Sequence, residues 1–393
     1  MEFRKKEQII IDTLDERKII FLIGPRQVGK TTLLKSIFSG IQSEKKLFLN
    51  LEILDYHEYF KDFGSINNLL LKNGFNKNEL FYLFLDEFHK VKNIDWVIKS
   101  LYDEYENLRI ILSGSNNIEI NKNIKESFAG RKRVINMFPL DFDEFLIWKE
   151  KVDVDKVEEF KQNPLNKSKI YYYLEEFLVW GGYPEVVLQK KGEEKKQILQ
   201  DIFSFWFNKD ILIEIREAYK FNNFLKQLAI RNGNLLNINE IAKEIGVSQP
   251  TSEYYFDLMF KSLLVYPLKP FFTNKLKEIV KMPKFYFIDN GFRNFLINRF
   301  EFLDDEKGLL FENFIYSEFL KKGINYEEIK FWRTKNGVNE VDFVFESLKK
   351  IYEVKYKEKT KKSDLDGINS FNKHHEGFNS LIINKENFYS LTF

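Results

Sequence analysis

A glycine-rich loop near the N-terminus constrains the fold of this chain more than any other feature. The loop has the spacing G-x-x-x-x-G-K-T and comprises Gly24, Pro25, Arg26, Gln27, Val28, Gly29, Lys30, Thr31 and Thr32. An apolar run, residues 19–23, precedes it, and residues 33–38 read as the first turns of a helix. Glycines let the backbone aim successive N–H groups at one anion, and a helix N-terminus adds partial positive charge. A strand, this loop and a helix together predict a phosphate-binding loop.

Polar residues in and after this loop predict a nucleotide site. Lys30 is expected to reach the β- and γ-phosphates, and the Thr31 hydroxyl is expected to ligate Mg²⁺. Residues 80–85 form an apolar run that ends in Asp86 and Glu87, as a strand buried on both faces would. We expect Asp86 to hold Mg²⁺ through water, and Glu87 to orient or deprotonate the attacking water. No guanine-specific motif is apparent, so ATP is the nucleotide we expect.

Several segments of the chain resemble a widespread prokaryotic family of AAA+ ATPases. They are residues 24–34, 85–87, 113–115, 129–131, 138–146, 180–187 and 284–291. Members of that family join an ATPase to a C-terminal half of uncertain function. The resemblance covers nearly the whole chain, with a departure at Phe88 and His89, where an aliphatic residue and a glutamine are usual.

The resemblance implies two more residues at the nucleotide. A polar residue at the end of a third buried strand, which we expect to begin at residue 108, would sense the γ-phosphate, and we favour Ser115 over its rivals Ser113 and Asn116. Arg131 lies in a basic run further on and is the candidate arginine finger. It would act on its own nucleotide or on that of a neighbouring copy. A homo-oligomer is expected if it acts on a neighbour.

Composition limits the other function classes. The chain has 393 residues and no cysteine, which excludes disulfides, thiolate zinc sites and a cysteine nucleophile. Lys and Arg number 61 against 59 Asp and Glu, so contact with nucleic acid would need local basic patches. The N-terminus lacks a signal-peptide core and no window suits a membrane span, so we expect a cytoplasmic protein. No function is assigned to the histidines, His57, His89, His374 and His375.

The chain is expected to have an α/β fold with three domains. Residues 1–190 would form the P-loop AAA+ ATPase domain, with an exposed, charged insertion at 149–168 before a helix at 169–180. Residues 191–270 would form a helical segment and a winged helix, and residues 271–393 a restriction-endonuclease-like domain.

The winged helix is expected from a helix-turn-helix pattern in residues 236–262. One helix covers residues 239–245, Gly246 supplies the turn, Ser248 caps a second helix, and residues 263–270 would form wing strands. If the second helix enters a DNA major groove, its contacts are Gln249, Thr251, Ser252 and Tyr255. Acidic residues on the same helix, Glu253 and Asp257, equally allow a structural or protein-contacting role.

The C-terminal part resembles the PD-(D/E)xK nuclease core. A helix over residues 308–322 and strands at 329–333, 340–345 and 351–356 carry the relevant side chains. Strict alternation would place Val341, Phe343 and Phe345 on one face, opposite Glu340 and Asp342. In the nuclease interpretation Asp342 and Glu353 ligate Mg²⁺, Lys355 positions or activates water, and Glu312 completes the acidic cluster. The alternative is a simple Glu–Lys pair beside an unrelated Asp.

A basic stretch beside this cluster is the best local candidate for a nucleic-acid contact, although a solvated face would look the same. It comprises Lys355, Lys357, Lys359, Lys361 and Lys362. The favoured function is therefore ATP hydrolysis coupled to DNA binding, with metal-dependent DNA cleavage if the C-terminal site is active. The alternative is a nucleotide-controlled switch or scaffold whose nuclease-like fold only binds. A remodelling motor is less favoured, because no substrate-threading pore loop is identifiable.

Overall fold

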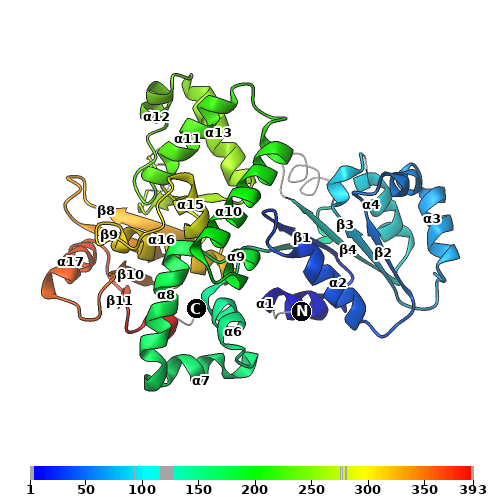
Figure 1. Cartoon of the computed structure of the whole chain (residues 1–393), viewed down its shortest axis with the longest axis horizontal. Helices are drawn as coiled ribbons and strands as arrows, with labels where there is room; N and C mark the ends of the chain where they lie inside the picture. The colour runs from blue at the N-terminus through cyan, green and yellow to red at the C-terminus, as the bar shows by residue number, and fades with distance from the viewer. Residues whose placement is uncertain are drawn as a thin grey trace. The chain divides into compact units, whose positions relative to one another are not determined.

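The computed structural model describes residues 4–92, 94–115, 128–274, 276, 278 and 281–390. These residues form two compact units, Met1–Phe138 and Pro139–Phe393 (Figure 1). The division falls well before residue 190, where the sequence suggested that the ATPase part ends. No helix within the described part of the chain is long and apolar enough to cross a membrane.

A five-stranded parallel sheet forms the centre of the first unit. The strands are, in spatial order, β2 (Lys46–Asn50), β3 (Phe81–Asp86), β4 (Leu108–Ser115), β1 (Ile19–Gly24) and β5 (Lys132–Asn136). Every residue of β1 is buried, which confirms the strand expected from its apolar run. β3 and β4 likewise confirm the buried strands expected before Asp86 and Ser113.

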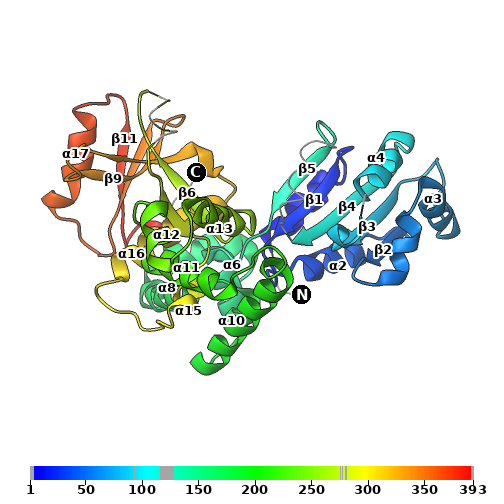
Figure 2. The same ribbon diagram turned by 90° about the horizontal axis from the view of Figure 1, so that it is seen from above.

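Helices cover both faces of this sheet. They are α1 (Lys5–Thr13), α2 (Lys30–Gly40), α3 (Phe63–Lys72) and α4 (Ile94–Glu104). Figure 2 shows α2 and α4 on opposite faces. This arrangement follows from the strand order, because right-handed crossovers that run in opposite directions along a sheet place their helices on opposite faces.

A six-stranded mixed sheet and a set of helices form the second unit. The strands are, in spatial order, β11 (Asn379–Ile383), β10 (Lys350–Val354), β9 (Glu340–Phe345), β8 (Ile329–Arg333), β6 (Val265–Pro270) and β7 (Lys284–Phe287). The helices are α6 (Phe142–Glu150), α7 (Val157–Gln162), α8 (Lys167–Trp180), α9 (Pro184–Leu188), α10 (Gly192–Trp206), α11 (Ala218–Ile230), α12 (Ile238–Ile245), α13 (Gln249–Lys261), α15 (Asn290–Leu296), α16 (Lys307–Lys321) and α17 (Asp366–Asn372).

The strand β6 belongs to both regions that the sequence separated at residue 270. It pairs antiparallel with β7, as a wing strand would, and also parallel with β8 through Lys269–Lys330 and Pro270–Phe331. The expected boundary between 191–270 and 271–393 therefore runs through one continuous sheet. Composition gave no sign of this, because strand pairing depends on residues about sixty positions apart.

Contacts between two of the family-like segments, 180–187 and 284–291, explain why the ATPase unit ends before the expected boundary at residue 190. Asp289 caps α15 by accepting the Phe292 N–H at 2.9 Å, and its other oxygen accepts the Gly182 N–H at 2.7 Å. Gly291 lies so close to the Trp180 carbonyl that an added Cβ would fall far inside the 3.0 Å that real Cβ contacts respect. The segment before residue 190 therefore packs as part of the second unit.

The expected insertion at 149–168 contains helical structure and an anchored lysine. Its helix α7 buries Val157, and Lys161 is almost fully buried. The Lys161 ammonium donates to Asp143 at 2.8 Å and to the Tyr389 carbonyl at 3.0 Å. The charged composition suggested an exposed segment, and this prediction was wrong for the lysine because its charge is paired inside the unit.

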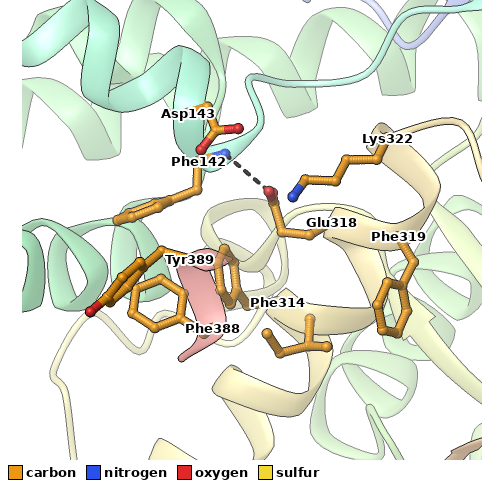
Figure 3. Close-up of a pocket in the computed structure, with 9 residues that line it drawn as sticks. Phe142, Asp143, Phe314, Glu318, Phe319, Lys322, Phe388 and Tyr389 are labelled. Carbon is orange, nitrogen blue, oxygen red and sulfur yellow. Dashed lines mark hydrogen bonds between the residues drawn. The ribbon is translucent and has the colours of Figure 1, made fainter. Parts of the chain in front are cut away.

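A small cavity lies between α6 and α16 in the second unit (Figure 3). Its volume of about 20 Å³ is enough for one water molecule. Glu318 borders it and accepts the Phe142 N–H at 3.2 Å. Burial raises the pKa of Glu318 to about 7. The cavity is too small for an organic ligand.

Candidate functional site

The ends of four parallel strands bring the predicted nucleotide-site residues to one edge of the first sheet. In the strand register Gly24 lies beside Ser115, and Asn50 lies beside Asp86. Carboxyl ends of parallel strands form the ligand edge of open α/β sheets. The sequence assigned these residues to the site from separate motifs, and the parallel sheet places them at the same end of its strands.

The glycine-rich loop has the backbone conformation that an anion site needs. Gln27 and Gly29 have positive φ angles of 59° and 93°. Gly29 precedes α2 and supplies no side-chain cap, so the first N–H groups of the helix lack intrahelical partners. Arg4 supports the loop from outside, since its guanidinium donates to the Val28 carbonyl at 2.7 Å and to the Phe138 carbonyl at 2.8 Å.

The Lys30 side chain lies inside this loop. It is 5% exposed and donates to the carbonyl oxygens of Pro25 at 2.7 Å and Gly24 at 3.0 Å. Thr31 is partly exposed in the first turn of α2, and Thr32 is exposed. The ammonium, the helix N-terminus and the Thr31 hydroxyl are thus the groups that can hold the phosphates of a nucleotide and its Mg²⁺.

Asp86 is buried at the end of β3 and receives a hydrogen bond from the Ser113 hydroxyl. Ser113 was a rival sensor in the sequence analysis. The structure makes it a partner of Asp86, which orients that carboxylate from the neighbouring strand. Asn116, the other rival, lies outside the described residues.

Glu87 follows in a left-handed backbone conformation, with φ at 55°. Burial raises the pKa of its carboxyl, while the positive charges of Lys30 and Arg26 oppose that shift. Among the described residues its Oε2 atom has no hydrogen-bond partner. A buried carboxylate oxygen without a partner fits a group that waits for a substrate water, because such an oxygen is costly to leave unpaired otherwise.

His89 is a site residue that the sequence analysis missed. Its Nδ1 lies 3.3 Å from Glu87 Oε2, and its Nε2 lies 3.4 Å from the Ser115 hydroxyl. Burial and the nearby charges of Lys90, Arg26 and Lys30 lower the pKa of His89 to about 3, so its ring is neutral. Its position two residues after Glu87 could have indicated a role at the site, but the family that the chain resembles usually has a glutamine there, so no role was assigned to His89.

Arg131 lies at the opposite edge of the sheet from the phosphate loop. Its carbonyl accepts the Ile19 N–H at 2.8 Å, at the start of β1, whereas the loop follows the end of β1. Six residues of β-strand, about 20 Å, separate the two edges. Its guanidinium pairs with Asp103 at 2.9 Å. The option that Arg131 acts on its own nucleotide was therefore wrong, because sequence proximity to a strand does not say which end of the sheet a residue occupies.

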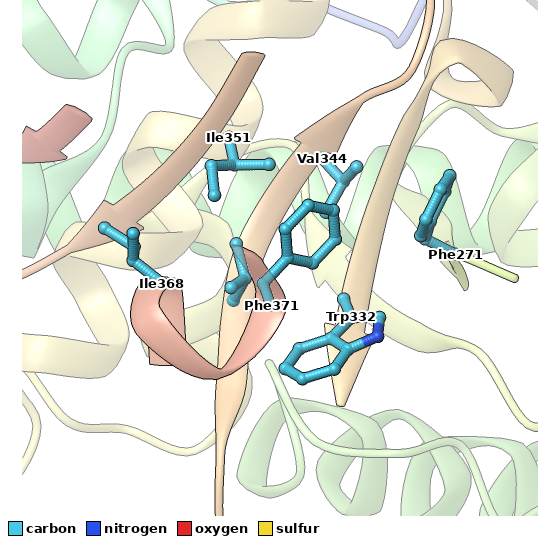
Figure 4. Packing of buried hydrophobic residues seen from close by; sticks show 7 residues of the cluster. Phe271, Trp332, Val344, Ile351, Ile368 and Phe371 are labelled. Carbon is cyan, nitrogen blue, oxygen red and sulfur yellow. The ribbon is translucent and has the colours of Figure 1, made fainter. Parts of the chain in front are cut away.

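In the second unit, a β-bulge places Asp342 in the predicted acidic cluster. β8 and β9 pair as Lys330–Val344 and then as Trp332–Val341, so Asp342 and Phe343 together face Phe331. Such a bulge interrupts the alternation of faces. Val341 and Val344 therefore share a core with Ile351, Ile368 and Phe371 (Figure 4), whereas Phe343 and Phe345 contact Phe319 of α16. The expectation that Val341 shares a face with Phe343 was wrong.

Asp342, Glu353 and Lys355 are brought together, as the sequence suggested. Asp342 accepts the Val354 N–H at 2.7 Å, and Lys355 donates to Glu353 at 2.6 Å. Burial and the carboxylates of Glu312 and Glu353 raise the pKa of Asp342, and the Lys355 charge opposes them. The other Glu353 oxygen is buried without a hydrogen-bond partner within the described residues.

Glu312 is occupied by other residues in this structure. It receives hydrogen bonds from Lys284, at 3.3 Å, and from the Tyr286 hydroxyl, and Lys284 also pairs with Glu340. Across the described ranges, no group of three or more His, Cys, Asp or Glu side chains is arranged to hold a metal ion. A cation at this cluster would therefore depend on Asp342 and Glu353.

The second helix of the helix-turn-helix pattern is α13, and only part of its predicted face is accessible. Ser252 and Tyr255 are buried, and Tyr255 packs on Phe221 and Phe224 of α11. These two residues were predicted to meet DNA, which the packing contradicts. Gln249 is exposed and bonds Glu253 at 2.8 Å.

Comparisons with known proteins agree with this description of the first unit. Residues 16–146 match the family model described as an AAA domain, and residues 171–302 and 307–391 match two models that are each described as a domain of unknown function. The first unit therefore carries a P-loop, AAA-like ATPase domain.

The relatives are themselves uncharacterised proteins. One from Methanocaldococcus jannaschii is 28% identical over 377 residues, which cover 91% of this chain and 79% of the relative. One from Haemophilus influenzae is 27% identical over 353 residues, which cover 86% and 82%. Among solved structures, the Walker-type ATPase of Pyrococcus abyssi is 14% identical with a TM-score of 0.48 and covers 76% of this chain and 96% of that chain.

Proposed function

We propose that this chain, whose first unit carries an AAA domain, binds ATP with Mg²⁺ and hydrolyses it to ADP and phosphate. The observation that carries the proposal is the convergence of Lys30, Asp86 and Glu87 at one sheet edge beside an anion-binding loop. Each supplies a different requirement of phosphoryl transfer: charge on the phosphates, a metal ligand and a proton acceptor.

The proposed roles follow from the positions of the residues. The loop N–H groups and Lys30 bind the phosphates, and Thr31 and Asp86 hold Mg²⁺, which neutralises charge on the phosphate oxygens when bound. A water oxygen bonds to the γ-phosphorus while the bond to the β–γ bridging oxygen breaks, and that oxygen leaves with ADP. Glu87 accepts the proton of the water, and its raised pKa keeps it a capable base.

Phosphate release by the purified full chain tests this proposal. Wild-type protein with Mg²⁺ should turn over ATP, and Glu87→Gln should lower kcat by about 100-fold or more while it keeps nucleotide affinity. Lys30→Ala should lower the affinity for ATP. Glu79→Gln, a change at an exposed glutamate of the same unit, is the matched control. Absence of wild-type turnover both with and without DNA, or full turnover by Glu87→Gln, would overturn the proposal.

A second candidate function concerns DNA and the second unit. The gathering of Asp342, Glu353 and Lys355 favours a PD-(D/E)xK-like site that binds DNA and, with a divalent cation on the two carboxylates, cleaves it. The helices α12 and α13 with the antiparallel pair β6–β7 support a winged-helix arrangement beside it. The alternative is a nucleotide-controlled switch or scaffold that binds without cleavage, which the pairing of Lys284 with Glu312 favours.

Nicking of supercoiled DNA with Mg²⁺ separates the two possibilities. The nuclease proposal expects cleavage that Glu353→Ala and Lys355→Ala each abolish, while changes at two exposed residues of the same unit, Glu358→Ala and Lys373→Ala, retain it. DNA retention on a filter without any nicking by wild-type protein would leave the scaffold function. ATP turnover that rises with DNA would support coupling of the two units.

A further inference from the structure

His89 occupies the space between the proposed γ-phosphate sensor and the proposed base. It lies in a short turn, Phe88–Lys90, directly after Glu87. One ring nitrogen faces Glu87 Oε2 at 3.3 Å and the other faces the Ser115 hydroxyl at 3.4 Å. The imidazole therefore contacts both side chains, one through each ring nitrogen.

The ring is tightly held in this place. The His89 side chain is 8% exposed, and the Cβ that an alanine would add at Gly114 would lie 3.2 Å from His89 Nδ1 and 3.1 Å from the Phe88 ring. The absence of a side chain at Gly114 thus lets the imidazole approach β4. Ser115, the next residue, stands beside Gly24 in the strand register, and so beside the phosphate loop.

A neutral imidazole has one N–H, and this restricts what the two nitrogens can do together. If the Ser115 hydroxyl donates to Nε2, the proton resides on Nδ1 and can be donated to Glu87 Oε2. If the hydroxyl instead donates to a phosphate oxygen, Nε2 can carry the proton and donate to the Ser115 oxygen. Nδ1 is then a bare lone pair that repels the carboxylate.

We propose that His89 is a positioning residue that couples the Ser115 hydroxyl to the Glu87 carboxylate by exchanging its two neutral tautomers. Without γ-phosphate, His89 Nδ1–H holds Glu87 turned toward the ring. When Ser115 contacts the γ-phosphate, the ring proton moves from Nδ1 to Nε2 through solvent, and Glu87 is released toward the attacking water. The overall charge of the ring does not change.

Two atoms left without partners support this coupling. Glu87 Oε2 and His89 Nδ1 are both buried and, within the described residues, neither makes a hydrogen bond of good geometry, although they lie 3.3 Å apart. A small rotation of either side chain would complete the bond. Such a near contact fits two alternative arrangements better than one fixed pair. The low pKa of His89 agrees with a ring that stays neutral in both.

This inference rests on the proposed ATPase function, and variants of the full chain distinguish the two. Nucleotide affinity and kcat would be measured for wild type, His89→Phe, His89→Gln and Ser115→Ala. Phenylalanine fills the space but cannot hydrogen-bond, so kcat should fall by about 10- to 100-fold at unchanged affinity. Glutamine can rotate its amide to offer Glu87 a donor or an acceptor, and its kcat should stay within about 3-fold of wild type.

The double variant His89→Phe/Ser115→Ala supplies a readout that packing would not change. Coupling through one ring predicts non-additive losses, with the double variant no slower than the slower single variant. The inference would be overturned if His89→Phe kept the kcat of the wild type, or if the losses in the double variant were fully additive. In either case, ATP turnover by the wild-type protein would still support the ATPase proposal. If His89→Phe does not fold, the same cycle is measured with His89→Leu, whose side chain likewise cannot hydrogen-bond. A wild-type protein without turnover would refute the ATPase proposal and this inference with it.

Discussion

The close approach of Gly291 to Trp180 makes a substitution at Gly291 the sharpest test of how the second unit is held together. An alanine Cβ there would meet the Trp180 carbonyl far inside 3.0 Å, and its other near neighbour is the Gly181 nitrogen at 2.9 Å. All of these are backbone atoms, which cannot rotate away as a side chain would. We therefore expect Gly291→Ala to push α15 away from the turn at Gly181.

The size of the effect follows from three contributions. Overpacking of a closed contact costs about 1–3 kcal/mol. A shift of about 1 Å also breaks the 2.7 Å hydrogen bond from the Gly182 N–H to Asp289, and a buried donor left unpaired costs about 1–3 kcal/mol. Alanine in a helix recovers up to about 1 kcal/mol. The net destabilisation should be about 3 kcal/mol.

Urea unfolding of the full chain, followed by tryptophan fluorescence, measures this loss. Four of the five tryptophans belong to the second unit, and Trp180 stacks on Phe300 with ring centroids 4.6 Å apart. With an m-value of about 3 kcal/mol/M, the midpoint should fall by about 1 M.

Gly308→Ala is the matched control, since Gly308 is also the second residue of its helix and a Cβ there meets nothing within 4 Å. It should leave the midpoint unchanged or raise it. A wild-type unfolding midpoint for Gly291→Ala, or an equally lowered midpoint for Gly308→Ala, would contradict the predicted clash at Gly291.

Three further predictions concern buried and exposed charges. Lys161→Met should destabilise the second unit by about 3 kcal/mol, because it removes the buried ammonium that pairs with the buried Asp143 carboxylate. Burial raises the pKa of Glu318 to about 7, so folding favours the protonated carboxyl. The resulting stabilisation is complete below about pH 4.5 and is lost as the pH rises through 7. Glu318→Gln should remove this pH dependence. Arg131→Ala should cost at most about 1 kcal/mol, because its pairing with Asp103 is exposed, while ATP turnover falls only at concentrations where copies associate.

Unfolding midpoints and turnover rates check these expectations against neighbouring changes. Lys156→Met alters an exposed lysine and should leave the midpoint unchanged, so an equal loss in both variants would contradict a specific role for Lys161. A Glu318→Gln protein whose stability still falls between pH 6 and pH 8 as in wild type would assign that dependence to another group. Arg133→Ala is the control for Arg131, and equal turnover of both at every concentration would exclude the arginine finger.

The first unit could be predicted from the sequence because its signals are local. Strands buried on both faces appear as uninterrupted apolar runs, and the phosphate loop has a fixed spacing within nine residues. Lys30 and Asp86 therefore lie where the pattern placed them. The domain boundary predicted at residue 190 was wrong because contacts such as that of Gly182 with Asp289 join residues 107 positions apart. Such long-range contacts cannot be read from composition.

The errors in the candidate sites have geometric causes. Arg131 was assigned by its place after a strand, but the strand direction puts it at the edge remote from the nucleotide loop. Ser113 was only a rival to Ser115 as the sensor, and the neighbouring strand supplies Asp86 as the hydrogen-bond partner of its hydroxyl. The face assignment of Val341 assumed unbroken alternation, which the single extra residue in β9 defeats. His89 has no motif of its own, and only its two distances reveal it.

The double pairing of β6 has a practical consequence for anyone who divides this protein into fragments. A fragment that begins at residue 271 would lack β6 and would leave one side of β8 without its neighbour. Unpaired strand edges expose N–H and C=O groups that recruit other chains, so such a fragment would be prone to aggregate. A fragment that ends at residue 270 would keep β6 but lose both of its neighbours, β7 and β8. Expression of the second unit should therefore start at Pro139 and keep the whole sheet.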